Sequence, residues 1–117
     1  MSRPDADSDG DLFVYGSLLD PTHRAELIGR EVAAVPARIA GYERRRGRYF
    51  HIVQRAGVET EGLVLSGLGE RDFMVLDRYE EVPRLYTRVK VEVTDAGGMA
   101  RRCWVYLPTA AALEPKG

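Results

Sequence analysis

The sequence predicts an α+β fold in which a mixed β-sheet, rolled into a small barrel-like structure, is flanked by helices. Three observations predict it. Strand-like segments outnumber helical ones in the order β-α-β-β-β-α-β-β, the two best-defined strands are joined by a hairpin turn, and few helices lie between strands. A doubly wound parallel sheet needs a helix after nearly every strand, so this order excludes it.

The first third of the chain is expected to contain a leader, a strand and a helix. Residues 1–10 are polar and acidic, and we expect them to be disordered. Residues 11–15 form a short apolar strand. Asp20 suits the N-cap of a helix, Pro21 its first position, and Gly29 its C-terminal stop.

The middle of the chain reads as extended. Pro36 interrupts residues 31–42, which favours an edge or bulged strand, and residues 48–54 and 60–67 are expected to be two further strands. After a helix at about 69–80, residues 87–95 alternate, with Val89, Val91 and Val93 on one face. Their connection to the last strand, residues 100–108, contains "DAGG", a hairpin signal.

Composition indicates one globular domain. The chain has 117 residues, which suits a domain at 11–108 followed by a C-terminal tail at 109–117. A net charge of −1 gives no overall attraction for nucleic acid or an anionic membrane. No apolar run suggests a membrane span or signal peptide, so a cytoplasmic location is expected. Cys103 stands alone and is expected to be a small core residue.

The helix at 69–80 carries two adjacent glutamates that are not equivalent. On a helical projection Glu80 falls between Leu76 and Phe73 on the apolar arc, whereas Glu81 falls outside it. Burial and the negative end of the helix dipole both raise the pKa of a carboxyl group, which makes Glu80 a candidate general base. The alternative is structural: a frayed helix end with Glu80 bonded to Arg84 or Arg88.

A second candidate site is the sharp exit from the first strand, "YGSL". Gly16 and Ser17 can bring consecutive backbone N–H groups to one side, where they would bind an anion such as a carboxylate. The helix that follows directs its positive end toward the same place. An ordinary strand-to-loop turn would have the same sequence, so this alternative stays open.

Several segments together resemble the γ-glutamylcyclotransferase-like superfamily. They are "VYGSLL", "TEGLVL", "LDRYEEVPRLYTRVKVEV" and "CWVYL", in that order, within residues 12–107. The run "LD-x-aromatic-E…P-x-LY-x-R" is most similar to the γ-glutamylamine cyclotransferase branch. The resemblance implies a barrel-like fold with a cavity at its mouth. It also implies cyclisation of a γ-glutamyl group to 5-oxoproline with release of an amine.

The resemblance also assigns residues. Its catalytic glutamate falls on Glu80, and Glu81 stands where many relatives have glycine or another small residue. The loop that binds the γ-glutamyl head falls on Tyr15, Gly16, Ser17 and Leu18. Tyr86, Arg88 and Tyr106 are placed near the site, although a core role for the tyrosines and a surface role for the arginine would fit the pattern equally. No cofactor or metal is implied.

Other functions remain open at this stage. The same fold could serve as a non-catalytic module that binds a small ligand. Basic and aromatic residues interleave at 42–55 in a way that can bind single-stranded nucleic acid, although a solvated loop is the simpler explanation. His51 in this segment has no partner motif and is expected to be a strand histidine. We expect a small-molecule γ-glutamyl substrate and neither a nucleic acid nor a membrane partner. The amine and the choice between monomer and homodimer are left open.

Overall fold

The structure is a computed structural model that describes residues 7–46 and 50–113. It consists of five strands, a short 3-10 helix and three α-helices. In chain order they are β1 (Asp7–Val14), η1 (Ser17–Leu19), α1 (Pro21–Ile28), β2 (Ala34–Arg46), β3 (Phe50–Leu65), α2 (Glu70–Tyr79), β4 (Tyr86–Asp95), β5 (Ala100–Pro108) and α3 (Ala110–Leu113).

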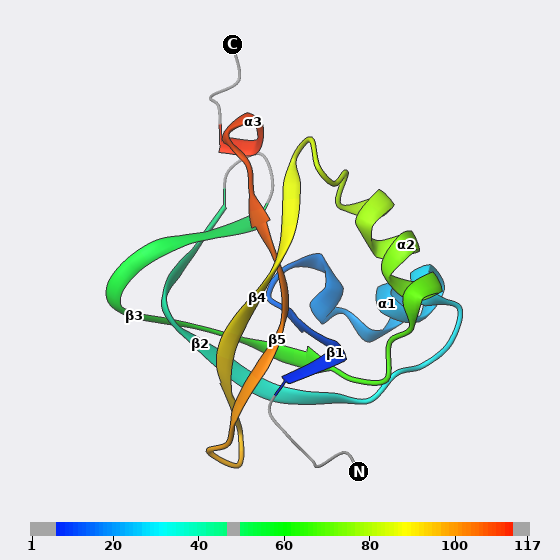
Figure 1. Cartoon of the computed structure of the whole chain (residues 1–117), viewed down its shortest axis with the longest axis horizontal. Coiled ribbons are helices and arrows are strands. Elements are labelled where there is room, and N and C mark those ends of the chain that lie inside the picture. Colours follow the sequence, from blue (N-terminus) through cyan, green and yellow to red (C-terminus); the bar gives the residue numbers. More distant parts are fainter. Residues whose placement is uncertain (1–6, 47–49, 114–117) are drawn as a thin grey trace.

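The strands form a closed barrel in the order β1-β3-β2-β4-β5. β1 pairs parallel with β5, which closes the barrel, and the other neighbours are antiparallel. Figure 1 shows α1 and α2 side by side at one flank of the barrel. The predicted α+β fold with a small mixed barrel and flanking helices is therefore confirmed.

Two details of the predicted strand pattern are wrong. The strands expected at 48–54 and 60–67 belong to one long strand, β3, which pairs with β2 along most of its length; residues 48 and 49 lie outside the described residues. The pairing jumps from Ala40↔Glu59 to Tyr42↔Gln54, so residues 55–58 bulge out opposite Gly41. Gly41 and Gly57 accommodate this irregularity with positive φ angles of 83° and 84°. The bulge interrupts the apolar pattern of β3, which explains why the sequence predicted two strands with a break between them.

β2 was expected to be an edge or bulged strand; the irregularity is present between Ala40 and Tyr42, but β2 is not an edge strand. It is one of the strands of the barrel wall, between β3 and β4, although it pairs with β4 only at Ala37 and Arg38. Pro36 is accommodated within the β2–β3 ladder opposite Leu63. The irregularity in β2 thus follows from Gly41 and not from Pro36.

The two ends of the domain are more ordered than expected. β1 begins at Asp7, inside the segment 1–10 that was expected to be a disordered leader. In the expected tail, Thr109 bonds to the carbonyl groups of Arg84 and Leu85, and α3 follows directly. Residues 1–6 and 114–117 lie outside the described residues.

Alternation along the strands separates two hydrophobic clusters. Leu12 and Val14 of β1 face the helices and pack in a cluster with Phe73 and Leu76 of α2. Phe13 and Tyr15 point the other way, into a barrel cluster that also contains the fully buried Val105 and Cys103. Burial raises the pKa of the Cys103 thiol to about 12, as expected of a core cysteine. Val89, Val91 and Val93 share this side as predicted.

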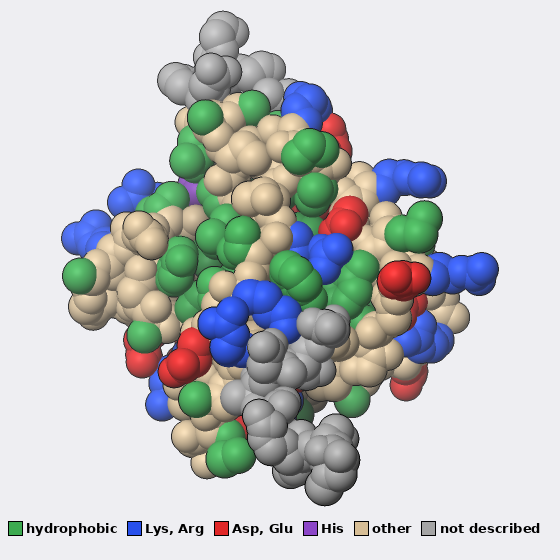
Figure 2. Space-filling model, viewed as in Figure 1, with side chains coloured by type: hydrophobic (Ala, Val, Ile, Leu, Met, Phe, Trp, Pro, Cys, Tyr) green, Lys and Arg blue, Asp and Glu red, His purple; other side chains and the backbone are tan. Residues whose placement is uncertain are grey.

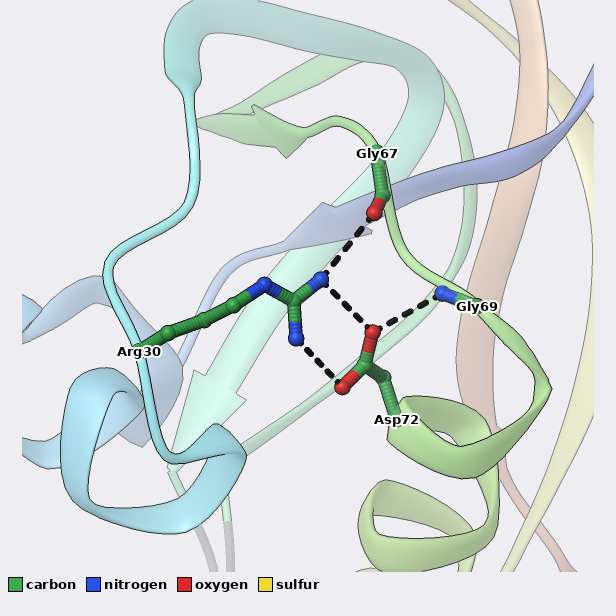
Figure 3. A network of polar contacts seen from close by, with 4 residues as sticks. All are labelled: Arg30, Gly67, Gly69 and Asp72. Atoms are coloured by element: carbon green, nitrogen blue, oxygen red, sulfur yellow. Dashed lines mark hydrogen bonds and ion pairs between the residues drawn. The ribbon is translucent and has the colours of Figure 1, made fainter.

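A bidentate ion pair fixes the start of α2 against the end of α1 (Figure 3). Arg30, just after α1, donates from Nη1 and Nη2 to the two carboxylate oxygens of Asp72, each at 2.8 Å, and also to the carbonyl of Gly67. Asp72 in turn accepts from the N–H of Gly69, the N-cap of α2. The bond from Arg30 holds the pKa of Asp72 below its usual value. At α1, Asp20 caps the helix through the N–H of Thr22 and Gly29 ends it, as predicted.

The close approach of β1 to β3 requires glycine at position 62. A Cβ there would lie 2.2 Å from the carbonyl oxygen of Val14 and 2.8 Å from Phe13 Cζ. Backbone cannot yield easily at this point, because Val14 is paired in register with Leu63. Gly62 therefore sets how tightly the barrel closes beside the residue that precedes the YGSL turn.

We predict that Gly62→Ala lowers the free energy of unfolding by about 3 kcal/mol or more, because the added methyl overlaps backbone in a packed core. Gly97→Ala is the control: its Cβ would meet only Asp95 Oδ1, at 3.4 Å, and we expect a change below about 1 kcal/mol. Urea denaturation of both variants measures the difference. Equal stability of the two would contradict the steric account.

Candidate active site

A cavity of about 380 Å³ opens where the end of β1, the end of α2 and strands β4 and β5 meet. Seven of the eight residues singled out from the sequence line it: Tyr15, Gly16, Ser17, Leu18, Glu80, Tyr86 and Tyr106. Its other lining residues include Arg46, Phe50, Tyr79 and Glu81. Segments that are far apart in the sequence thus share one concave site.

Glu80 is the carboxylate of this cavity that combines burial with a raised pKa. α2 ends at Tyr79, so Glu80 is the C-cap, and its N–H bonds to the carbonyl of Leu76 at 2.9 Å. Burial, and secondarily repulsion from Asp77 one helical turn earlier, raises the pKa of Glu80 to about 7. The carboxyl group is therefore poised to gain or lose a proton near neutral pH.

The alternative in which Glu80 is bonded to Arg84 or Arg88 is wrong. Arg84 pairs with Glu81, and Arg88 pairs with Asp77 at 2.9 Å. Within the described residues, no cation contributes to the pKa of Glu80. The two arginines that could have neutralised Glu80 are each engaged by a neighbouring acid.

Glu81 is more exposed than Glu80, as predicted, and its backbone adopts an unusual conformation. Its side chain is exposed and its backbone has a φ of 58°, in the left-handed region that disfavours side chains with a Cβ. Glycine, which has no Cβ, suits this conformation better than glutamate does. The unusual turn at Glu81 leaves the position of Glu80 at the helix end unchanged.

The YGSL turn lines the cavity and is held by hydrogen bonds at Tyr15. The hydroxyl of Tyr15 donates to the carbonyl of Tyr106 at 2.6 Å, and Arg44 donates to the carbonyl of Tyr15 at 2.9 Å. A Cβ on Gly16 would lie 3.1 Å from Phe50 Cβ, so glycine permits close packing here. Ser17 and Leu18 begin the 3-10 helix η1, and their N–H groups have no acceptor within that helix.

Tyr79, the last residue of α2, makes polar contacts at the cavity. It is 38% exposed, and its hydroxyl lies 2.7 Å from Ser17 Oγ and 2.9 Å from His23 Nε2. Tyr79 therefore ties the YGSL turn and α1 to the end of α2. The helical pattern of the sequence gave no sign of this polar contact.

The remaining predicted residues divide into two groups. Tyr86 and Tyr106 line the cavity; the Tyr86 hydroxyl donates to the carbonyl of Phe50, and the Tyr106 hydroxyl donates to Asp77, both at 2.6 Å. Arg88 does not line the cavity and lies behind it, against Asp77. Sequence reasoning missed Asp77, although it is the Asp of the "LD-x-aromatic-E" run.

Arg46 and Phe50, which flank the undescribed residues 47–49, also line the cavity, with Arg46 stacked 5.2 Å from the Phe50 ring centre. Their sequence signal was the basic and aromatic run at 42–55, which was considered for nucleic acid. His51 of the same run lies on β3 opposite Arg45, as expected of a strand histidine.

Within the described residues, no group of three or more His, Cys, Asp and Glu side chains could hold a metal ion. None of the helices in that part of the chain has the length and apolar character to cross a membrane.

Comparison with known proteins identifies the family. Residues 12–116 match the model of the family described as "Gamma-glutamyl cyclotransferase, AIG2-like". The chain belongs to this family. The match spans every residue that lines the cavity, whereas the finer γ-glutamylamine branch is not resolved by it.

Relatives in this family include AIG2-like protein C of Arabidopsis thaliana, 35% identical over 88 residues, which are 73% of this chain and 51% of that protein. A gamma-glutamylcyclotransferase and putative RNase of Methanocaldococcus jannaschii is 25% identical over 82% of this chain and 45% of its own length. The chain thus spans about half the length of these curated relatives. A solution structure from Arabidopsis thaliana shares the fold with a TM-score of 0.78 and 29% identity, covering 88% of this chain and 70% of that one.

We predict that Glu80→Gln makes the protein more stable at pH 8 but not at pH 4. The raised pKa means that the folded state binds the Glu80 proton more tightly than the unfolded state does, so the contribution of Glu80 to stability falls as the pH rises from about 4.5 to about 7. Glutamine removes this loss, which amounts to at most about 3 kcal/mol.

Urea denaturation from pH 4 to pH 8 measures the difference between the two proteins. Glu70→Gln, in the exposed first turn of the same helix, controls for the loss of one carboxylate. Parallel stability curves for the wild type and Glu80→Gln would show that Glu80 titrates like an exposed glutamate.

Proposed function

We propose that the protein is a γ-glutamyl cyclotransferase that converts a γ-glutamyl amide to 5-oxoproline and a free amine, with Glu80 as its general base and acid. The observation that carries the proposal is a partly buried carboxyl group with a pKa of about 7, which shares one cavity with the YGSL turn. Membership of the cyclotransferase family supports the same chemistry.

The first proposed step activates the nucleophile. The α-ammonium group of the substrate cannot attack until it loses a proton, and the Glu80 carboxylate would accept it. The nitrogen lone pair then attacks the γ-carbonyl carbon of the same molecule, and the carbonyl electrons move onto oxygen to give a tetrahedral oxyanion. Because both reacting groups belong to one molecule, the cavity mainly holds a folded conformer.

The second proposed step releases the amine. The oxyanion collapses, the bond between the γ-carbon and the leaving nitrogen breaks, and the proton held by Glu80 passes to that nitrogen. The ring nitrogen gives its second proton to the released amine, which leaves as an ammonium ion. Glu80 ends the cycle ionised, so one group serves both steps. A pKa near 7 suits this exchange, because each protonation state is accessible at neutral pH.

The YGSL turn is proposed to hold the γ-glutamyl head. The N–H groups of Ser17 and Leu18 and the Ser17 hydroxyl are donors for the α-carboxylate or for the oxyanion. Tyr86 and Tyr106 supply the aromatic walls of the cavity. Arg46 and Glu81 line it as well, where charges of both signs can contact the amine.

The structure favours a small-molecule ligand in the cavity over nucleic-acid binding by the arginines of residues 42–55. Arg44 is used to hold the carbonyl of Tyr15, and Arg45 pairs with Glu43 on the same strand. On the face drawn in Figure 2, acidic and basic side chains are interspersed, and basic side chains lie beside hydrophobic ones in the middle. A non-catalytic binding module of the same fold would keep the cavity, and product formation separates it from an enzyme.

We predict that incubation with a panel of γ-glutamyl amines and γ-glutamyl amino acids yields 5-oxoproline from at least one member, measured by mass spectrometry. Glu80→Gln should lower kcat by roughly 10²- to 10⁴-fold, because the amide can neither accept nor return the proton. Glu70→Gln serves as the control with unchanged activity.

Ligand-induced thermal shifts should persist in Glu80→Gln, since the variant keeps the cavity. Thermal shifts without product in the wild type would instead identify a binding module. Full turnover by Glu80→Gln would remove Glu80 from the mechanism.

A further inference from the structure

Behind Glu80 lies a polar network that the proposed mechanism does not use. Asp77, one helical turn before Glu80, accepts a hydrogen bond from the Tyr106 hydroxyl at 2.6 Å. It also accepts two from Arg88, from Nε at 2.9 Å and from Nη2 at 3.2 Å. Asp77 therefore connects the cavity wall at Tyr106 to a guanidinium group outside the cavity.

Arg88 is itself held firmly. Its guanidinium carbon lies 4.4 Å from the ring centre of Phe73 and 4.4 Å from that of Trp104, so the cation contacts two aromatic rings that are tilted by 65° to each other. These contacts hold the guanidinium group beside α2, where two of its N–H donors meet the carboxylate of Asp77. The side chains of Arg88 and Asp77 are only 22% and 29% exposed.

We propose that Asp77, held by Arg88, is a positioning residue for Glu80: its charge sets the proton affinity of the catalytic carboxyl group, and its carboxylate fixes the Tyr106 wall. This rests on the proposed function and deepens it, because it assigns the tuning of the proposed base. It also reassigns Arg88 from substrate binding to support of Asp77.

The charges around Glu80 favour Asp77 for this role. The titratable or charged side chains that line the cavity with Glu80 are Tyr15, Arg46, Tyr79, Glu81, Tyr86 and Tyr106. Asp77 is the acid that raises the pKa of Glu80 beyond the effect of burial. Glu81, although it lines the same cavity, pairs with Arg84 and does not contribute to the raised pKa of Glu80. Tyr15 and Tyr106 are held as neutral hydroxyl groups, since burial raises the pKa of both.

Two variants with opposite electrostatic effects test the proposal. Asp77→Asn keeps an oxygen that can accept from Tyr106 but removes the negative charge, so the titration midpoint of Glu80 should fall by about one pH unit. Arg88→Gln removes the cation that partly neutralises Asp77, so the midpoint should rise. Loss of packing alone would expose Glu80 and lower the midpoint in both variants.

The measurement is the pH titration of the Glu80 side-chain carboxyl carbon by NMR in the full chain, assigned with Glu80→Gln. This readout needs no turnover, so it remains informative if the wild type forms no 5-oxoproline and the proposed function fails. Where the wild type is active, the acid limb of kcat/KM should move with the NMR midpoint.

Tyr106→Phe separates the two parts of the role, because it removes the hydrogen bond but keeps the charge of Asp77. The Glu80 midpoint should then stay within about 0.3 units of the wild type, while KM rises. An unchanged midpoint in Asp77→Asn, or a fall in both Asp77→Asn and Arg88→Gln, would overturn the proposal.

Discussion

The proposed site depends on a carboxyl group that no cation among the described residues neutralises. Glu80 caps α2 inside a cavity, while Arg84 and Arg88, the basic residues that follow it, are bound to Glu81 and Asp77. Desolvation is then the dominant effect on its pKa, and the negative charge of Asp77 adds to it. A single ion pair to Glu80 would reverse this balance and leave an ordinary, permanently ionised glutamate.

The rest of the structure keeps that carboxyl group in place. The Arg30–Asp72 ion pair fixes the start of α2, Phe73 and Leu76 pack its middle against the barrel, and the turn at Glu81 ends it at the cavity. From the other side, the barrel brings the turn after β1 to the same cavity, because β1 lies between β3 and β5. A rigid barrel and a pinned helix thus hold the two halves of the site together.

The sequence predicted the fold class, the helices α1 and α2 and the β4–β5 hairpin, because these rest on local signals: Asp20 and Gly29 as caps, alternation at Val89, Val91 and Val93, and "DAGG". It placed Glu80 on the packing face through helical periodicity alone. The alternation of apolar residues did not predict β3 as one strand, because the bulge at 55–58 interrupts that alternation. The roles of Asp77 and Arg88 could not be predicted, because their contacts with each other and with Tyr106 join separate elements. The family resemblance placed Arg88 near the site because it matches residues along the sequence. It does not show which way a side chain points, and Arg88 contacts Asp77 outside the cavity.

The most direct test of the account is a crystal structure of Glu80→Gln with a bound γ-glutamyl amide, since this variant should bind without turning over. The account predicts the α-carboxylate or the γ-carbonyl against the backbone N–H groups of residues 16–18, and the α-ammonium group within hydrogen-bonding distance of residue 80. A γ-glutamyl group bound in the same cavity with its ammonium directed away from residue 80, or bound outside the cavity, would contradict the central claim that the YGSL turn and Glu80 act on one substrate.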